Sequence, residues 1–405
     1  MEKLTVMTTD ESITIRTATD DDWDSVALLD AHAFGEHQNA EDLAETQILT
    51  KSEHVYLAWD GQTPVGVAMH FPMSVTVPGG AQLEASGVSW VSVAPTHRRR
   101  GILRSIFTQQ HRALNDAGAP LSLLTASEAT IYGRFGYGPV TEEISVSIDR
   151  RFAQFRKDAP PATGVRLIES AEAAELLPDI YHRWQQQTAG AQPKPPIRWE
   201  RFFADRENRR GGLTALFFIV HPDGYVAYRR GTNPSRVVVQ EFIAVTDEAY
   251  AAMWQILIGV DLVDTIEVRQ SRDEALPFLL TNNRLPKVTA HHDALWARIM
   301  DVRAALEART YALDTSLIIA VRDPFLDAGG TYSFDVTDGR ATCTRVESEP
   351  DIELDIDVLA SIYFGTHRAR LFAAANRLTA RDEASLHALD LTFGTPRPAV
   401  MGWAF

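Results

Sequence analysis

A basic, glycine-containing turn between a strand and a helix constrains this chain more than any other feature of its sequence. The pattern of Gln82–Val93 predicts a strand, and Pro95 after it predicts a turn. The basic run His97–Arg100 then leads to Gly101, and apolar residues at helical spacing follow, from Leu103 to Ala117. The first N–H groups of a helix lack an intrahelical partner and lie at the positive end of its dipole. This turn is therefore a candidate anion site.

The basic turn stands out because the chain as a whole is acidic. Its 405 residues include 39 Lys and Arg against 54 Asp and Glu, a formal net charge of −15. Such a surface repels phosphate backbones, so we predict no nucleic-acid partner, and it attracts cationic small molecules or peptides. Arginines clustered in an acidic chain favour a pyrophosphate site over a solvated turn, and Gly101 lets the backbone approach the ligand.

The order of predicted elements indicates several domains built on mixed sheets. The length predicts two or three domains, and 45% hydrophobic with 23% charged residues is typical of globular protein. Strands alternate with helices over the first 150 residues, and the Pro- and Ala-rich segment Asp158–Gly164 indicates a boundary. A second α-plus-β region follows, and a third begins with a predicted helix at Leu295–Ala308 and includes a hairpin turn at Asp338-Gly339. The predicted class is α/β, with α+β mixed sheets.

Several residue types argue against metal, disulfide or membrane roles. The single cysteine, Cys343, excludes an internal disulfide and a C-x-x-C zinc site. Asp20–Asp22 are interpreted as helix-capping residues and His291-His292 as surface residues, so we expect no metal. Apolar runs such as Ala215–Val220 are too short to span a membrane, and residues 1–10 do not resemble a signal peptide. We predict a cytoplasmic protein.

Longer motifs carry a family resemblance. The spacing Arg98-x-x-Gly101 after Val-Ser-Val resembles the acyl-CoA loop of the GNAT acetyltransferases. Four longer motifs extend the resemblance: Val91–Gly101, Ile131–Pro139, Ala304–Arg309 and Ala373–Leu378. Together they are similar to the enhanced-intracellular-survival (Eis) family of actinobacteria, which are multi-acetylating aminoglycoside N-acetyltransferases. Leu103 replaces the small residue of the general GNAT loop, and a bulky residue there is compatible with this family.

The resemblance implies three domains and an assembly. A GNAT domain that binds acetyl-CoA would span residues 1–142, a degenerate GNAT-like domain 143–296, and a sterol-carrier-protein-like domain with the catalytic C-terminus 297–405. The sequence supports this asymmetry, because the basic-glycine run of the second region, Arg209–Gly212, precedes a strand and is interpreted as a loop. A homohexamer is implied by the resemblance alone.

The same resemblance implies where acetyl-CoA binds. Val91, Ser92 and Val93 would offer backbone groups to the pantetheine arm, as an added strand would. Ser127 and Glu128 would line the far side, although capping of a short helix is their competing role. The residues around the pyrophosphate would be Arg98, Arg99, Arg100, Gly101, Ile102, Leu103 and Arg104.

Transfer of an acetyl group from a thioester to an amine requires a base for the ammonium proton and an acid for the thiolate. Tyr132 is the candidate acid, and a packed aromatic residue is the alternative interpretation. The candidate base is the carboxylate of Phe405, although an α-carboxyl in water has a pKa of about 3.5 and needs burial to become a useful base. A frayed tail is the alternative, but the apolar end disfavours it. By resemblance, Tyr132 is the general acid and Phe405 the general base, while Ala404 replaces an acidic residue of relatives.

The sequence therefore predicts acetyl-CoA-dependent N-acetylation of aminoglycoside-like polycationic amines at several positions. Direct attack in a ternary complex is expected, because no nucleophile for an acyl-enzyme is evident. Two alternatives stay open. One is a protein or peptide lysine N-acetyltransferase, and the other is a non-enzymatic sensor that binds acyl-CoA or lipid.

Overall fold

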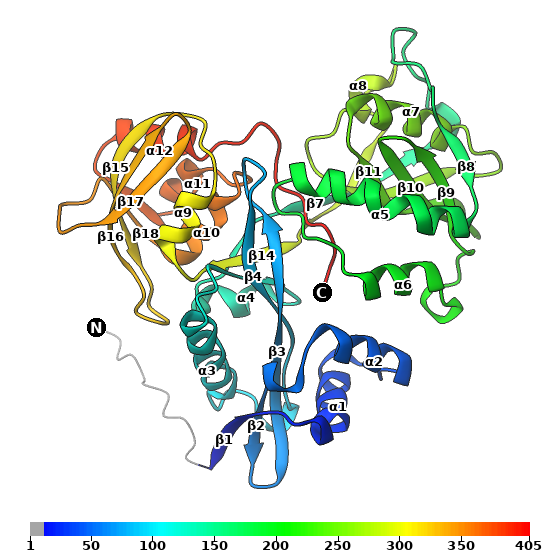
Figure 1. The fold of residues 1–405 in the computed structure, drawn as a ribbon. Helices are drawn as coiled ribbons and strands as arrows, with labels where there is room; N and C mark the ends of the chain where they lie inside the picture. The colour runs from blue at the N-terminus through cyan, green and yellow to red at the C-terminus, as the bar shows by residue number, and fades with distance from the viewer. Residues whose placement is uncertain (1–11) are drawn as a thin grey trace.

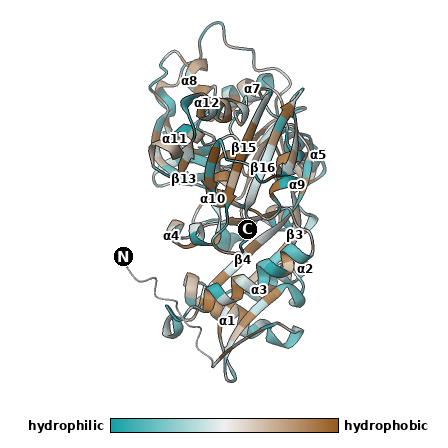
Figure 2. Cartoon of the chain, turned by 90° about the vertical axis from the view of Figure 1, so that its left-hand side faces the viewer, coloured by the Kyte–Doolittle hydropathy of each residue, from teal (hydrophilic) through white to brown (hydrophobic). Residues whose placement is uncertain are grey.

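The computed structural model describes residues 12–405, which form three lobes, each built around a β-sheet (Figure 1). Apolar residues gather in the strands, for example β15 (Figure 2). No helix in residues 12–405 is long and apolar enough to cross a membrane. The described part of the chain also contains no group of three or more His, Cys, Asp or Glu side chains placed to hold a metal ion.

The first sheet has the strand order β1-β2-β3-β4-β5-β14-β6, in which only β4 and β5 pair in parallel. The structure confirms the strands predicted over 55–59, 64–77, 82–93 and 121–126 to within two residues. The strands are β1 (Ile13–Thr17), β2 (Val55–Asp60), β3 (Thr63–Thr76), β4 (Gln82–Val93), β5 (Leu121–Thr125), β6 (Gly138–Pro139) and β14 (Leu295–Ile299). The helices are α1 (Trp23–Phe34), α2 (Ala40–Leu49), α3 (Ile102–Asp116) and α4 (Ala129–Tyr132). Helix α2 was not predicted.

Strands β4 and β5 diverge, and this opening positions the site. Their pairing ends at Gly87 and Leu123, while β4 continues to Val93. Within that continuation Trp90 has a φ of 51°, and the register between β3 and β4 shifts beside it. A β-bulge of this kind bends a strand and changes the direction of a side chain. The end of β4 is therefore free of β5 and carries a redirected tryptophan.

The second sheet repeats the pattern of the first. Its order is β13-β7-β12-β11-β10-β9-β8, again with one parallel pair, β11 and β12, next to a run of antiparallel strands. Its strands are β7 (Glu142–Asp149), β8 (Arg166–Ile168), β9 (Phe217–His221), β10 (Gly224–Thr232), β11 (Ser235–Ala244), β12 (Thr265–Gln270) and β13 (Lys287–Asp293). Its helices are α5 (Ser170–Gln187), α6 (Pro196–Ala204), α7 (Asp247–Ile258) and α8 (Leu276–Leu279).

The two sheets exchange strands. After β6, at the edge of the first sheet, the chain crosses to β7 in the second sheet, and after β13 it returns to β14 in the first. The predicted helix over Leu295–Ala308 is therefore wrong in its first half, because Leu295–Ile299 is a buried strand between β5 and β6. A short apolar run cannot be assigned to a strand or a helix by periodicity alone. Only Val302–Ala308, helix α9, is helical.

The third sheet packs against the first lobe. Its order is β17-β16-β15-β18-β19, and Asp338 and Gly339 both have positive φ in the turn that joins β16 to β17, which confirms the predicted hairpin. Helix α10 contacts β14 and β6, and a Cβ on Gly138 would lie only 2.1 Å from the Asp357 carbonyl oxygen. The strands are β15 (Thr315–Arg322), β16 (Gly330–Thr337), β17 (Arg340–Arg345), β18 (Ile352–Asp355) and β19 (Leu378–Ala380). The helices besides α9 are α10 (Ile356–Tyr363), α11 (Ala369–Ala374) and α12 (Glu383–Thr392).

Candidate active site

The turn after β4 has the geometry of an anion site. Arg99 and Gly101 adopt left-handed backbone conformations, with φ of 65° and 79°, and Gly101 is the N-cap of α3. The backbone N–H of Ser105 donates to the Gly101 carbonyl over 3.0 Å, which starts the helical hydrogen-bond ladder. The N–H groups before Ser105, from Gly101 to Arg104, lie at the positive end of the helix dipole.

The basic side chains of the turn do not all point the same way. Arg98 and Arg99 are exposed, whereas the Arg100 guanidinium lies 3.6 Å from the Asp60 carboxylate. The guanidinium of Arg104 lies over the ring of Phe325 in the third lobe, 5.6 Å from its centroid. Three arginines therefore gather at the turn, and the fourth, Arg104, reaches toward the third lobe.

Other predicted residues near the turn have side chains that pack inside the first lobe, which leaves their backbone groups as the candidates for ligand binding. Ile102 is buried, and Leu103 packs partly buried against the same apolar cluster of the first lobe. The buried hydroxyl of Ser92 donates to the Leu29 carbonyl over 3.2 Å, so its side chain is already used inside the protein. Val91 and Val93 flank it on the part of β4 that has diverged from β5.

Tyr132 lies at the end of α4, which follows β5 directly, and only 4% of it is exposed. Its ring packs 6.3 Å from both Phe107 and Tyr137, measured between centroids. Burial raises the pKa of the Tyr132 phenol, while a hydrogen bond with Ser127 opposes that shift. The phenol therefore stays protonated at neutral pH, as a proton donor must. Ser127 and Glu128 are exposed, and Glu128 is the N-cap of α4.

The C-terminal segment is fixed between the first two lobes (Figure 1). The Val400 N–H donates to the Ala189 carbonyl over 2.8 Å, and the N–H groups of Gly402 and Trp403 donate to Oε1 of the buried Gln192 over 2.9 and 3.3 Å. These partners belong to the loop between α5 and α6 of the second lobe. Residues 400–403 thus follow a defined path and are not a frayed tail.

Phe405 ends this path at the carboxyl end of β5. The hydroxyl of Thr125 donates to its main-chain oxygen over 2.6 Å. The ring of Phe405 meets Phe71 edge-on at 5.4 Å and Trp403 at the same centroid separation. Ala404 beside it is exposed. The main-chain oxygen of Phe405 therefore lies at the end of β5, where β4 and β5 have separated. Tyr132 lies at the end of the next helix along the chain, α4.

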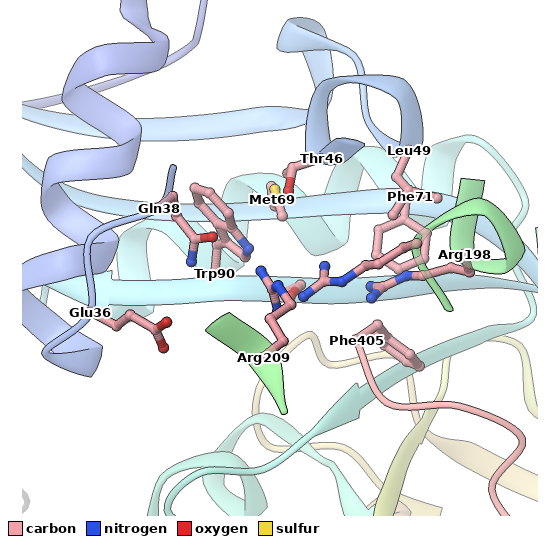
Figure 3. Close-up of a pocket in the computed structure, with 12 residues that line it drawn as sticks. Glu36, Gln38, Thr46, Leu49, Met69, Phe71, Trp90, Arg198, Arg209 and Phe405 are labelled. Atoms are coloured by element: carbon pink, nitrogen blue, oxygen red, sulfur yellow. The ribbon is translucent and has the colours of Figure 1, made fainter. Parts of the chain in front are cut away.

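A cavity of about 180 Å³ opens beside Phe405 (Figure 3). Its apolar wall comes from the first lobe and includes Phe71 and Trp90, the redirected residue of the β4 bulge. Arg198 and Arg209 reach into it from the second lobe, and Glu36 lies on the opposite side. The full lining is Glu36, Gln38, Thr46, Leu49, Met69, Phe71, Ser89, Trp90, Arg198, Arg201, Arg209 and Phe405.

Sequence patterns did not indicate most of this cavity. Arg209 belongs to the basic-glycine run that was interpreted as a loop, and it does lie at the end of a short turn, Glu207–Arg209. Thr125, Gln192 and Arg198 carry no motif, and the fold brings them from distant parts of the chain to residues 402–405. His291 and His292 are exposed on β13, which fits their interpretation as surface residues.

The fold and the site together define the class of protein. Family models for an acetyltransferase (GNAT) domain match residues 14–140 and 190–303, and a model for a sterol carrier protein domain matches residues 302–402. The chain is thus a GNAT acetyltransferase in which two GNAT domains precede a sterol-carrier-protein domain. Acetyltransferases of this fold use acetyl-CoA as the acetyl donor.

Comparison with individual proteins narrows this class. N-acetyltransferase Eis of Mycobacterium tuberculosis (strain H37Ra) is 39% identical over 406 residues, covering 97% of this chain and 100% of the relative. The crystal structure of Eis1 from Mycobacterium abscessus has a TM-score of 0.87 at 30% identity and covers 97% of this chain and 100% of that one. A GCN5-related N-acetyltransferase from Anabaena variabilis, with a TM-score of 0.83 at 19% identity and the same coverage, shares the fold. The chain belongs to the Eis family of N-acetyltransferases.

Proposed function

We propose that this enzyme transfers the acetyl group of acetyl-CoA directly to an amine, with Tyr132 as general acid and the Phe405 carboxylate as general base. One observation carries the proposal. The 2.6 Å hydrogen bond from Thr125 holds a main-chain oxygen of Phe405 at the end of β5, beside a cavity and next to the divergence of β4 and β5.

Acetyl-CoA would bind along this divergence. Its pantetheine arm would pair with the edge of β4 that β5 leaves free, at Val91–Val93, and its pyrophosphate would accept from the N–H groups of Gly101 to Arg104. Arg98, Arg99 and Arg100 supply positive charge at the same turn. Ser127 and Glu128 would line the far side. No nucleotide loop is needed, because a helix N-terminus supplies the donors.

The reaction needs two proton transfers. The free amine attacks the thioester carbonyl, the new C–N bond forms, and the C–S bond breaks. The proton lost by the amine passes to the Phe405 carboxylate, and the departing thiolate takes the proton of the Tyr132 hydroxyl. Burial keeps that phenol protonated.

The acceptor class implied by the resemblance is an aminoglycoside-like polycation, acetylated at several positions. Glu36 and the Phe405 carboxylate would attract an ammonium group, whereas the arginines of the cavity oppose a second one. The number of acetyl groups per acceptor is therefore part of the test. A homohexamer and a cytoplasmic location stay predictions.

Thiol release from acetyl-CoA in the presence of an aminoglycoside tests the proposal. We expect release that depends on the acceptor, with acetylated product detected by mass spectrometry. A chain without Phe405 should lose turnover and keep acetyl-CoA binding, measured by calorimetry. Acceptor-independent release, or normal turnover without Phe405, would overturn the proposal, while binding of acetyl-CoA without any transfer would favour the sensor alternative.

A further inference from the structure

A fully buried ion pair joins the first lobe to the third. Arg298 of β14 donates to the Asp323 carboxylate through both ends of its guanidinium, Nη1 to Oδ1 over 3.2 Å and Nη2 to Oδ2 over 2.6 Å. Neither side chain is exposed to solvent. Replacing such a pair by apolar residues often costs no stability. Within residues 12–405 the Arg298 Nε also lacks a hydrogen-bond partner, which is unfavourable in a buried site. Stability alone therefore does not explain this arginine.

The arginine has a second partner, on the segment that follows Tyr132. Its Nη1 also donates to the Phe135 carbonyl over 2.8 Å. Phe135 ends the short turn Gly133–Phe135, which begins directly after Tyr132. Gly136 then has a φ of 82°, and a Cβ there would collide with the Arg298 guanidinium. The backbone of this turn thus lies directly against the arginine.

The same turn is also held from inside the first lobe. The N–H of Tyr137 donates to the Tyr132 carbonyl over 3.3 Å. The Tyr137 hydroxyl lies 2.7 Å from His111 Nε2 and 2.6 Å from the Ser122 hydroxyl. The segment after Tyr132 therefore has two anchors, one within its own lobe and one at Arg298, whose orientation is set by the third lobe.

Asp323 is itself held by its own lobe. It follows β15 directly, and its Oδ1 accepts from the N–H groups of Phe325 over 3.2 Å and Leu326 over 3.4 Å. The ring of Phe325 meets Phe135 edge-on, with 5.1 Å between the centroids. This segment of the third lobe thus supplies the carboxylate that orients Arg298 and an aromatic contact with the turn that follows the proposed acid.

We propose that Asp323 and Arg298 are positioning residues for the general acid: the carboxylate orients the guanidinium, and the guanidinium fixes the turn that places the Tyr132 hydroxyl. The inference rests on the proposed function, in which Tyr132 is the acid. Because neither side chain is exposed, neither contacts a substrate or exchanges a proton with one. The third lobe then helps to place the acid, as the tail that follows it places the base.

A pair of neutral substitutions removes the anchor without leaving a buried charge. In the variant Arg298→Met with Asp323→Asn, methionine cannot donate to the Phe135 carbonyl. Asparagine can still accept the backbone N–H groups that Asp323 accepts now. Arg298→Lys keeps the charge and a donor and tests rescue. Arg322→Gln is the control, because it removes an exposed ion pair with Asp355 that stays within the third lobe.

The readout is a double-mutant cycle with Tyr132→Phe. The single-turnover rate of acetyl transfer to kanamycin, at saturating acetyl-CoA, is measured for the neutral pair with and without Tyr132→Phe. Calorimetry gives the affinity for acetyl-CoA, and the melting temperature reports folding. A residue that acts through Tyr132 affects the rate only while the hydroxyl is present, whereas a general packing effect slows both backgrounds equally.

We expect the neutral pair to slow transfer about tenfold when Tyr132 is present, because a small displacement of a reacting group has an effect of this size or larger. In the Tyr132→Phe background the same substitutions should slow transfer less than about twofold, since the group that they displace is gone. The affinity for acetyl-CoA should not change. Arg298→Lys should retain most of the rate, and Arg322→Gln all of it.

Equal slowing in both backgrounds would overturn the inference, and so would an unchanged rate in the neutral pair, while Tyr132 would stay the acid in either case. If the neutral pair fails to fold, Asp323→Glu enters the same cycle with the same expectation, because it keeps the charge and moves the carboxylate by one methylene. A Tyr132→Phe protein as fast as the wild type would instead reject the proposed acid, and the inference with it.

Discussion

The hydroxyl of Thr125 donates a 2.6 Å hydrogen bond to the main-chain oxygen of Phe405, although 280 positions separate the two residues. This contact connects the last residue of β5 in the first GNAT domain with the end of the chain, which follows the sterol-carrier domain. It also fixes one oxygen of the carboxylate that we propose as the base. If Phe405 is the base, the chemistry depends on how the domains pack, and variants at this contact test that dependence.

Thr125→Val should lower kcat about tenfold, because it removes one hydrogen bond to a charged group and keeps the shape of the side chain. KM for acetyl-CoA should change little, because the substitution leaves the end of β4 and the turn before α3 untouched. Thr125→Ser retains the hydroxyl and should keep most activity. Steady-state kinetics of the three proteins gives the answer, and equal loss in both variants would mean that packing matters more than the hydrogen bond.

Gln192→Met should release the tail. The Oε1 of this buried residue accepts from the N–H groups of Gly402 and Trp403, and methionine fills a similar volume without accepting them. We expect a fall of about tenfold in kcat, on the scale of two lost hydrogen bonds. Melting temperature serves as the control for general unfolding. A normal kcat at an unchanged melting temperature would show that Gln192 does not position the tail.

Tyr132→Phe removes the proposed acid without removing the ring. Because general acid catalysis is typically worth about 10²–10⁴-fold, we expect a loss of about 100-fold in the single-turnover rate of acetyl transfer. Binding of acetyl-CoA should persist, since the pyrophosphate turn is untouched. An unchanged rate would reduce Tyr132 to a packing residue among Phe107 and Tyr137.

The buried histidine of α3 makes stability depend on pH. His111 lies 2.7 Å from the Tyr137 hydroxyl and 2.9 Å from the Phe107 carbonyl oxygen. Burial, and then the charge of Arg298, lower its pKa from 6.5 to about 3. The folded protein thus keeps His111 neutral, while the unfolded chain binds a proton below about pH 6.5.

The free energy of unfolding should therefore decrease as the pH is lowered. Below pH 6, His111 accounts for a decrease of about 1.4 kcal/mol per pH unit. Above pH 7 this part vanishes, because both states are neutral. Urea unfolding between pH 4 and pH 8 measures the slope. His111→Gln should be less stable at pH 7 but lose stability less steeply as the pH falls, and an identical slope would contradict the assignment.

Patterns within a few residues predicted much of the fold. Strand β4 was predicted with its observed bounds, and the positive φ of Gly101 and of Asp338-Gly339 follows from residues that tolerate this conformation. The strand Leu295–Ile299 could not be predicted in the same way, because its neighbours in the sheet, β5 and β6, lie more than 150 positions earlier in the chain. Its burial was decided by tertiary packing.

The candidate site likewise contains local features, which the sequence predicted, and features that arise from tertiary packing, which it did not. The turn before α3 is local, so a basic run before a glycine and a helix was enough to predict its geometry. Tyr132 and Phe405 were predicted through family motifs. Arg198 and Gln192 were missed, because each acquires its place only when the second domain meets the tail, and neither has a motif of its own.

The central claim concerns a single chemical group, the carboxylate of Phe405. Semisynthesis can replace it with a carboxamide and leave every side chain in place. We predict that the amidated protein binds acetyl-CoA with unchanged affinity and transfers acetyl groups at least about 100-fold more slowly, the scale of a lost general base. A single-turnover rate equal to that of the unmodified protein would contradict the claim.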